Sequence, residues 1–294
     1  MADSDDLPHF PFDGREFRLE MGLVPLAVED WIEFGDDDRL QLQQRAELLT
    51  SKRDQVLQYL DEAEAACREL NVLLRRHLLK FLPARVAGSE NQLRLQHSGV
   101  LLPEPQSGLE ALEQLAHLAQ EDFCVLSGDE RPRLIAGLVC FPSHWSLPEK
   151  LGQTSDQIHA SVPDFPQRLS VPTNAVLRKL LPERPVWRLN WTLNDSAALH
   201  TPGPKSFPAS LDSATVLDST WLRIERQTLR RLPQTEAIVF TIRTFQQRLS
   251  DIVRDSRRRE QFAVTLQSLP AATAEYKGLN TILPLLLQAV NSNC

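Results

Sequence analysis

The chain has 294 residues, 42 % of them hydrophobic, and a formal net charge of −7 at pH 7. This length supports one large domain or two modest ones, and the negative charge gives no global field that would attract nucleic acid or an anionic membrane. The longest apolar run, LIAGLVCF at 134–141, is far shorter than the roughly 18 residues of a spanning helix. Because the acidic start MADSDDLPHF resembles neither a secretory signal nor a transit peptide, we expect a soluble, cytoplasmic protein.

The common sequence signatures of nucleotide, zinc and covalent haem sites are missing. No G-x-G-x-x-G, phosphate-binding loop, H-E-x-x-H or C-x-x-C-H occurs. Without C-x-x-C spacing, the cysteines are best explained as thiols in a reducing compartment. They are Cys67, Cys124, Cys140 and Cys294.

The first part of the chain is predicted to be irregular and then helical. Residues 8–35 lack periodicity, and residues 37–82 are the clearest helical stretch. In the second part of that stretch apolar residues step by three or four, which indicates one buried helix face. LPARVAGSENQ then breaks the pattern, and residues 109–121 predict another short helix.

Strand patterns begin at residue 122. Residues 122–143 and 220–245 each predict a β-hairpin, and 186–194 predicts a linking strand. Short helical turns are expected over 146–160, followed by a helix interrupted near Pro172, and the tail reads as helices. About five strands with helices around them predict an α+β fold with an antiparallel sheet.

His159 is the histidine whose local sequence is most restrictive. Two capping boxes, Ser146 with Glu149 and Thr154 with Gln157, predict two short turns, and His159 follows the second. A histidine held on such a rigid element suits a metal ligand. A histidine at a helix end also commonly caps carbonyl groups, so both interpretations remain open.

The other histidines compete for the same role. His77 lies on an apolar helix face, where a satisfied core residue is expected, and His144 and His200 are expected in loops. No pair has zinc-site spacing, but a single histidine is enough for a haem because the porphyrin supplies four ligands. We expect the remaining ones on the surface: His9, His97 and His117.

The hairpin sequence TWLRIERQTLRRLPQTEAIVFTIRTF is rich in arginine. Strand alternation places Arg223, Glu225 and Gln227 on one face and Arg226 on the other. These arginines either form a solvated, ion-paired face or bind carboxylates. The 186–194 strand adds Arg188, on a polar face that fits a pocket wall or an exposed sheet.

Four stretches, taken together and in order, resemble the family of the haem-dependent oxidative N-demethylase α subunit, long catalogued as a domain of unknown function. They are GLVPLAVEDWIEF, EKLGQTSDQIHASVPDF, RLNWTLND and LRIERQTLRRLPQTEAIVFTIRTF. The resemblance implies a PAS-like, antiparallel five-stranded sheet with short helices. On that basis we divide the chain into an N-terminal extension with helices (1–121), a PAS-like haem-binding core (122–245) and C-terminal helices (246–294), together forming one compact unit.

The resemblance also implies the ligand, the activity and the partners. It implies noncovalent haem b, with His159 as the axial and only protein ligand of the iron. It implies O₂-dependent demethylation of a small secondary amine such as dimethylamine, releasing formaldehyde, with electrons from NADPH through a separate reductase that carries flavin and an iron–sulfur centre. Glu225 is the candidate catalytic residue, for pairing with the cationic amine or for proton delivery. Candidates for the haem propionates are Arg223, Arg226 and Arg230, and Arg188 is a further candidate for binding the cofactor.

Two other functions fit the same sequence. A PAS-like architecture also serves haem-based gas or redox sensors, and fold alone does not decide between sensing and catalysis. The arginine-rich hairpin could also be the protein-docking face of a haemless interaction or structural module. The basic cluster RDSRRRE at 254–260 is typical of a solvated helix face and could also dock an acidic redox partner.

Overall fold

The computed structural model describes residues 7–292, so residues 1–6 of the acidic start and Cys294 lie outside it. Over this range the main sheet has seven antiparallel strands in the order β1-β8-β9-β10-β6-β7-β2. They are β1 (Val24–Pro25), β2 (Leu57–Tyr59), β6 (Asp122–Leu126), β7 (Leu134–Leu138), β8 (Val186–Asn194), β9 (Trp221–Arg231) and β10 (Ile238–Arg248).

The α+β class and the antiparallel sheet are confirmed, while the strand number differs from the predicted five. The two predicted hairpins and the linking strand supply β6, β7, β8, β9 and β10. The short strands β1 and β2 then extend the sheet at its two edges. Edge pairs of two or three residues leave almost no periodic signal in a sequence, so they were missed.

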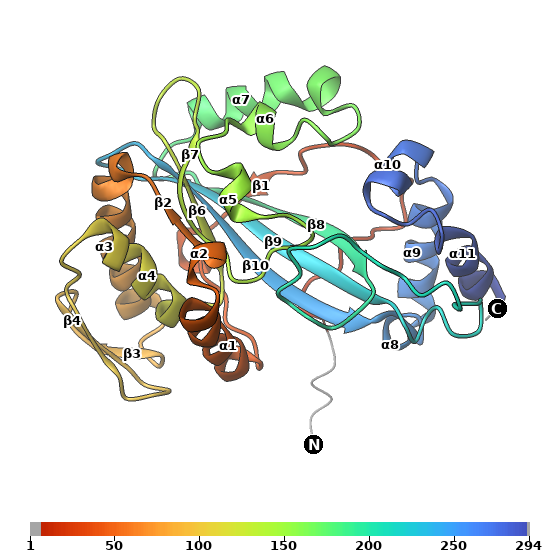
Figure 1. Cartoon of the computed structure of the whole chain (residues 1–294), viewed down its shortest axis with the longest axis horizontal. Helices are drawn as coiled ribbons and strands as arrows, with labels where there is room; N and C mark the ends of the chain where they lie inside the picture. The colour runs from red at the N-terminus through yellow and green to blue at the C-terminus, as the bar shows by residue number, and fades with distance from the viewer. Residues whose placement is uncertain (1–6, 293–294) are drawn as a thin grey trace.

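Helices surround the sheet on both faces, as Figure 1 shows. The α-helices in the described chain are α1 (Asp38–Ser51), α2 (Arg53–Val56), α3 (Glu64–Phe81), α4 (Gly108–Leu118), α5 (Leu147–Lys150), α6 (Ser155–Ile158), α7 (Ser170–Lys179), α8 (Leu249–Ile252), α9 (Ser256–Gln267), α10 (Ala271–Tyr276) and α11 (Leu283–Ser292). Shorter turns are η1 (Val28–Asp30), η2 (Asp61–Ala63) and η3 (Phe165–Leu169). No helix among residues 7–292 has the length and apolar character needed to cross a membrane.

The two faces of the sheet have different coverings. On one face Val125 and Val239 pack with α3 and α4, and Ile224 packs with α9 and α11. The side chains that alternate with these point to the other face, where α5, α6 and α7 lie (Figure 1). Gly137 of β7 helps to seat α5, because a Cβ there would lie 2.8 Å from Leu147 Cδ1.

Three details of the predicted helices are corrected. The 37–82 stretch is broken, because residues 57–59 leave the helix and pair with β7 as β2. Ser146 makes no capping hydrogen bond at α5. The predicted interruption falls between η3 and α7, and Pro172 sits in the first turn of α7, where a missing N–H costs nothing.

A second sheet, not predicted, occupies the region between α3 and α4. Its strands are β3 (Val86–Gly88), β4 (Gln92–Leu95) and β5 (Leu101–Pro103). The buried guanidinium of Arg75 in α3 holds it by donating to the carbonyls of Glu90 and Pro103, each at 2.7 Å. A buried arginine can connect a helix to a small sheet in this way because its N–H donors find acceptors there.

We expect the buried pair of Arg45 and Asp122 to be a main determinant of stability. The two side chains are 2.6 Å apart and 0 % and 1 % exposed. Arg45→Met should lower the free energy of unfolding by about 3–5 kcal/mol, because it leaves a carboxylate buried without its cation. Urea denaturation measures this change. The matched control is Arg53→Met, which breaks an exposed pair with Glu113 and should cost less than about 1 kcal/mol. Equal costs would contradict the prediction.

Candidate functional site

A cavity of about 740 Å³ opens on the sheet face that carries the short helices. Its other walls come from the segment 11–23, from α5 to α7 and from the end of α10. Apolar side chains of β6 and β10 and polar side chains of β8 and β9 share the floor. Floor residues include Cys124, Phe240, Arg188, Asn190, Glu225 and Gln227.

His159 follows α6, a single turn that is fixed at its start. Thr154 Oγ1 accepts the N–H of Gln157, and the Gln157 side chain accepts the N–H of Thr154, so the predicted capping box is confirmed. Just before it, the carbonyl of Gln153 accepts the N–H of Leu134 at 2.9 Å. The turn is therefore attached to the first residue of β7, and His159 is attached with it.

The imidazole of His159 lines the cavity, and one of its two nitrogens is already hydrogen-bonded. Nδ1 lies 2.8 Å from the carbonyl oxygen of Ser155, so it carries the proton and Nε2 carries the lone pair. Within residues 7–292 no hydrogen bond engages Nε2. The ring stacks on Phe165 with centroids 4.7 Å apart. Burial lowers the pKa of His159 and outweighs the opposing effect of the Ser155 hydrogen bond, so the ring stays neutral at pH 7.

This arrangement is the one that metal-binding histidines adopt, with the second nitrogen held by a carbonyl group. In the described chain no three His, Cys, Asp or Glu side chains converge on a metal position. A metal at His159 would therefore need most of its other ligands from a prosthetic group, as in a porphyrin. Cys124 also lines the cavity, but burial raises the pKa of its thiol to about 12, so it stays protonated.

Glu225 is the centre of a hydrogen-bond network on the floor. Its Oε2 accepts from Asn190 at 3.2 Å and from Gln227 at 3.0 Å. Its Oε1 accepts from Arg223 Nε at 3.2 Å. Arg188 Nε donates to Gln227 at 2.8 Å and completes the chain of contacts. The network joins direct cross-strand partners of β8 and β9, so strand register positions it.

Among the arginines predicted to bind a cofactor, Arg188 is the one that lines the cavity. Besides its bond to Gln227, it has a long contact of 3.4 Å from Nη1 to the carbonyl of Met21. Its Nη2 makes no hydrogen bond within residues 7–292. The guanidinium therefore keeps donors for a ligand, in agreement with the predicted polar face of this strand.

Arg223 shares the face of Glu225, but it is engaged elsewhere. Its side chain is fully buried and donates to the carbonyls of Leu199 and Phe141 and to Thr244 Oγ1. It fastens two loops to β9 and does not line the cavity.

Arg226 and Arg230 lie on the opposite face of β9 because strand side chains alternate. Arg226 pairs with Glu33 at 3.1 Å, and Arg230 lies 4.6 Å over the ring of Trp31. Neither side chain reaches the cavity on the other face. The sheet itself therefore separates these two predicted cofactor-binding residues from His159.

Two cavity residues were missed from the sequence, Lys205 and Lys277. Lys205 stands in the proline-rich loop after β8, and Lys277 directly follows α10. Isolated lysines in such positions carry no motif, so only the folded chain could identify them.

The loop histidines His144 and His200 have different surroundings. His144 lines the cavity, but its Nδ1 lies 2.7 Å from the carbonyl oxygen of Gly203 and its Nε2 lies 3.2 Å from Oδ1 of Asn194. Each ring nitrogen therefore faces a protein oxygen. His200 does not line the cavity, and its Nδ1 donates to the carbonyl of Cys140.

The surroundings of His77 and His9 differ from those predicted. His77 is buried, as expected, but in the described chain neither ring nitrogen has a partner, and burial lowers its pKa to about 4. His9 is not a free surface residue, because it packs against Trp187 and bonds to Glu33 at 2.8 Å.

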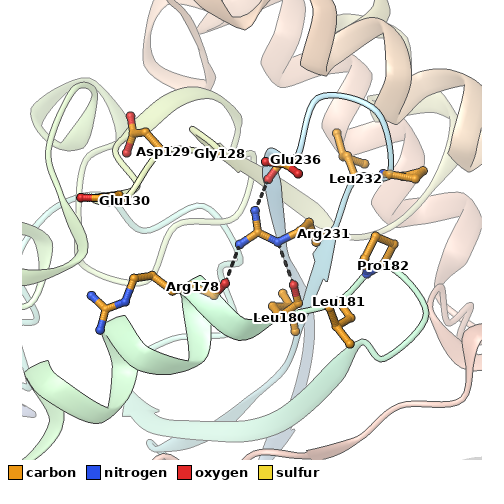
Figure 2. A pocket seen from close by; sticks show the side chains of 11 residues that line it. Gly128, Asp129, Glu130, Arg178, Leu180, Leu181, Pro182, Arg231, Leu232 and Glu236 are labelled. Carbon is orange, nitrogen blue, oxygen red and sulfur yellow. Dashed lines mark hydrogen bonds between the residues drawn. The ribbon is translucent and has the colours of Figure 1, made fainter.

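A smaller hollow of about 410 Å³ lies at the tip of the second hairpin, with Arg231 at its centre (Figure 2). Arg231 donates to the carbonyls of Leu177, Leu180 and Glu236 at 2.6–2.7 Å. These bonds tie the end of α7 to the hairpin. We call this set of hydrogen bonds the Arg231 joint. It holds α7, which forms part of one wall of the larger cavity.

Together, the antiparallel α+β fold and the cavity define a protein suited to a ligand coordinated by one neutral imidazole. A family model described as "haem-dependent oxidative N-demethylase, alpha subunit-like" matches residues 22–287. The chain belongs to this family, whose description makes it haem-dependent and oxidative and implies a partner subunit. The match contains the cavity floor, His159, Lys205 and Lys277, while residues 11–21 of the cavity wall precede it.

We predict that the ligand-free protein loses stability as the pH falls from about 10 to about 7. Burial, reinforced by Lys277, lowers the pKa of Lys205 from 10.5 to about 7, so in this range the unfolded chain binds more protons than the folded one. The free energy of unfolding should rise with pH and level off below pH 7. Urea denaturation at several pH values should show a smaller slope for Lys205→Met and no change for the exposed control Lys52→Met. An unchanged slope in Lys205→Met would refute this assignment.

Proposed function

We propose that the cavity binds haem b noncovalently, with Nε2 of His159 as the axial ligand. The observation that carries the proposal is the state of this imidazole: neutral, with Nδ1 held by Ser155 and Nε2 unengaged within the described chain. The family description supplies the haem dependence. In His144, the other cavity histidine, each ring nitrogen faces a protein oxygen.

The walls fit a porphyrin in size and character. A volume of about 740 Å³ falls in the range of cofactor pockets. Leu126, Leu229 and Phe240 supply apolar surface beside His159, while Arg188 and Glu225 bring polar groups to the floor. A bound macrocycle could therefore bury its ring against the apolar part and turn its charged edge to the polar part.

We propose that the reaction is oxidative removal of a methyl group from a small secondary amine such as dimethylamine. One amine and one O₂, with two electrons and two protons, give the demethylated amine, formaldehyde and water. Bound haem supplies the activation of O₂. The electrons are proposed to come from NADPH through a partner reductase with flavin and an iron–sulfur centre, in line with the alpha-subunit description.

Within this proposal Glu225 holds the cationic amine. It is a buried carboxylate on the cavity floor, fixed by Asn190, Gln227 and Arg223. A carboxylate held by three donors keeps one position and can accept a hydrogen bond from an ammonium group.

We also propose that the core is PAS-like. Support comes from the five strands β6 to β10, which form an antiparallel sheet with the short helices α5 and α6 on one face. On this view β1 and β2 are additions from the N-terminal region at the two edges.

The spectrum of a His159→Gly variant tests the ligand. We expect haem-loaded wild-type protein to show a Soret band, and the variant to lose the wild-type spectrum and regain it with added imidazole. His144→Ala, the matched control, should keep the wild-type spectrum. An unchanged spectrum in His159→Gly would refute the ligand assignment. Wild-type protein that stays colourless with haem would instead favour a haemless interaction module.

Formaldehyde release from a panel of methylated amines tests the activity. With O₂ and a reductase, Glu225→Gln should lower kcat/KM by about tenfold or more while the Soret band stays, because a charge-assisted hydrogen bond to the amine is lost. The matched control is Glu20→Gln, which changes an exposed carboxylate at the cavity wall. Reversible O₂ binding without formaldehyde from any amine would indicate a sensor.

A further inference from the structure

Two ammonium groups meet at one end of the cavity. Lys205 Nζ donates to Thr192 Oγ1 at 2.5 Å and to the carbonyl of Lys277 at 2.8 Å. Lys277 Nζ donates to the carbonyl of Trp191 at 2.7 Å and lies 4.3 Å over the ring of the same residue. Three separate segments, β8, the following loop and the end of α10, therefore build one cationic subsite.

The subsite has hydrogen-bond donors to spare. An ammonium group has three N–H donors, and the bonds above use two of Lys205 and one of Lys277. All of the acceptors are neutral. The two side chains thus retain three donors for a ligand in the cavity that both of them line.

No carboxylate pairs directly with these lysines, and Asp195 and Glu225 act on them only at longer range. Within residues 7–292 neither ammonium forms an ion pair at 4 Å or less. Glu225, the buried carboxylate of the cavity floor, accepts hydrogen bonds from Arg223, Asn190 and Gln227 and from neither lysine. Burial lowers the pKa of Lys205 to about 7 and that of Lys277 to about 8, so keeping the two ammonium groups charged in the cavity costs free energy.

The backbone also favours this arrangement. Gly278 follows Lys277 with a φ of +65°, a conformation that suits glycine, and a Cβ there would lie 3.4 Å from Lys205 Cδ. The glycine thus lets the chain turn sharply after Lys277 while the Lys205 stem packs against the turn.

We propose that Lys205 and Lys277 bind the propionate carboxylates of haem, the role that the sequence had predicted for Arg223, Arg226 and Arg230. This inference rests on the proposed function, because it assumes haem in the cavity. A porphyrin carries both carboxylates on one edge, so a single cationic end of the cavity can receive them together. The same two contacts would fix the rotation of the ring about the bond to His159.

Titration of the ligand-free wild-type protein with haem and with haem dimethyl ester tests this subsite. The ester keeps the iron and the ring but loses both negative charges. We expect haem to bind at least tenfold more tightly than the ester, since charged hydrogen bonds are lost, with His159 giving the same Soret position for both. Equal affinities would overturn the inference and leave haem binding intact. Failure of both to bind would overturn the proposed function instead.

Variants locate the effect within the cavity. Lys205→Met and Lys277→Met should each reduce the preference for haem over the ester by about tenfold, and the double variant should reduce it further. Lys150→Met is the matched control, because Lys150 also lines the cavity, beside α6. Loss of the preference in the control alone would overturn the assignment. The wild-type comparison holds even where a variant folds poorly.

Discussion

The pairing of β9 with β10 along its whole length, and with β8 over residues 221–229, is the constraint on which the site depends. Once that ladder forms, alternate side chains must face opposite sides of the sheet. Glu225 and Gln227 then face the cavity, while Arg226 and Arg230 face the helical layers behind it. A slip of one residue would exchange these sets, so the register decides which charges the cavity contains.

One face of the sheet carries most of the apolar core, and the other face carries the cavity. Behind the sheet, apolar clusters with α3, α4, α9 and α11 pack against it. In front of it the covering elements are short, and they stay in place through backbone pairing, a capping box and the Arg231 joint. Short elements that are fixed by hydrogen bonds can cover the sheet at one side and leave a cavity beside them. His159 belongs to such an element, so its orientation is set before any ligand binds.

Charge in the cavity is unevenly distributed. Among the charged lining side chains that are not exposed, one is a carboxylate, Glu225, and the others are the cations Lys150, Arg188, Lys205 and Lys277. A dianionic ligand would balance this excess and leave Glu225 able to meet a cationic amine. The proposed haem requires cationic groups in the cavity, whereas the proposed amine substrate requires an anionic one. The hydrogen-bond network around Glu225 keeps this carboxylate apart from the cations that would bind the haem.

The sequence by itself determined the α+β class, both hairpins, the 186–194 strand and the capped turn before His159, because these depend on local periodicity and capping. It also determined the opposite facing of Glu225 and Arg226, which follows from alternation alone. Only the tertiary structure decided which face carries the cavity, since that depends on which helices pack behind the sheet. The same packing brought Lys205 and Lys277, 72 positions apart, to one end of the cavity, and distant contacts of this kind leave no local pattern in a sequence.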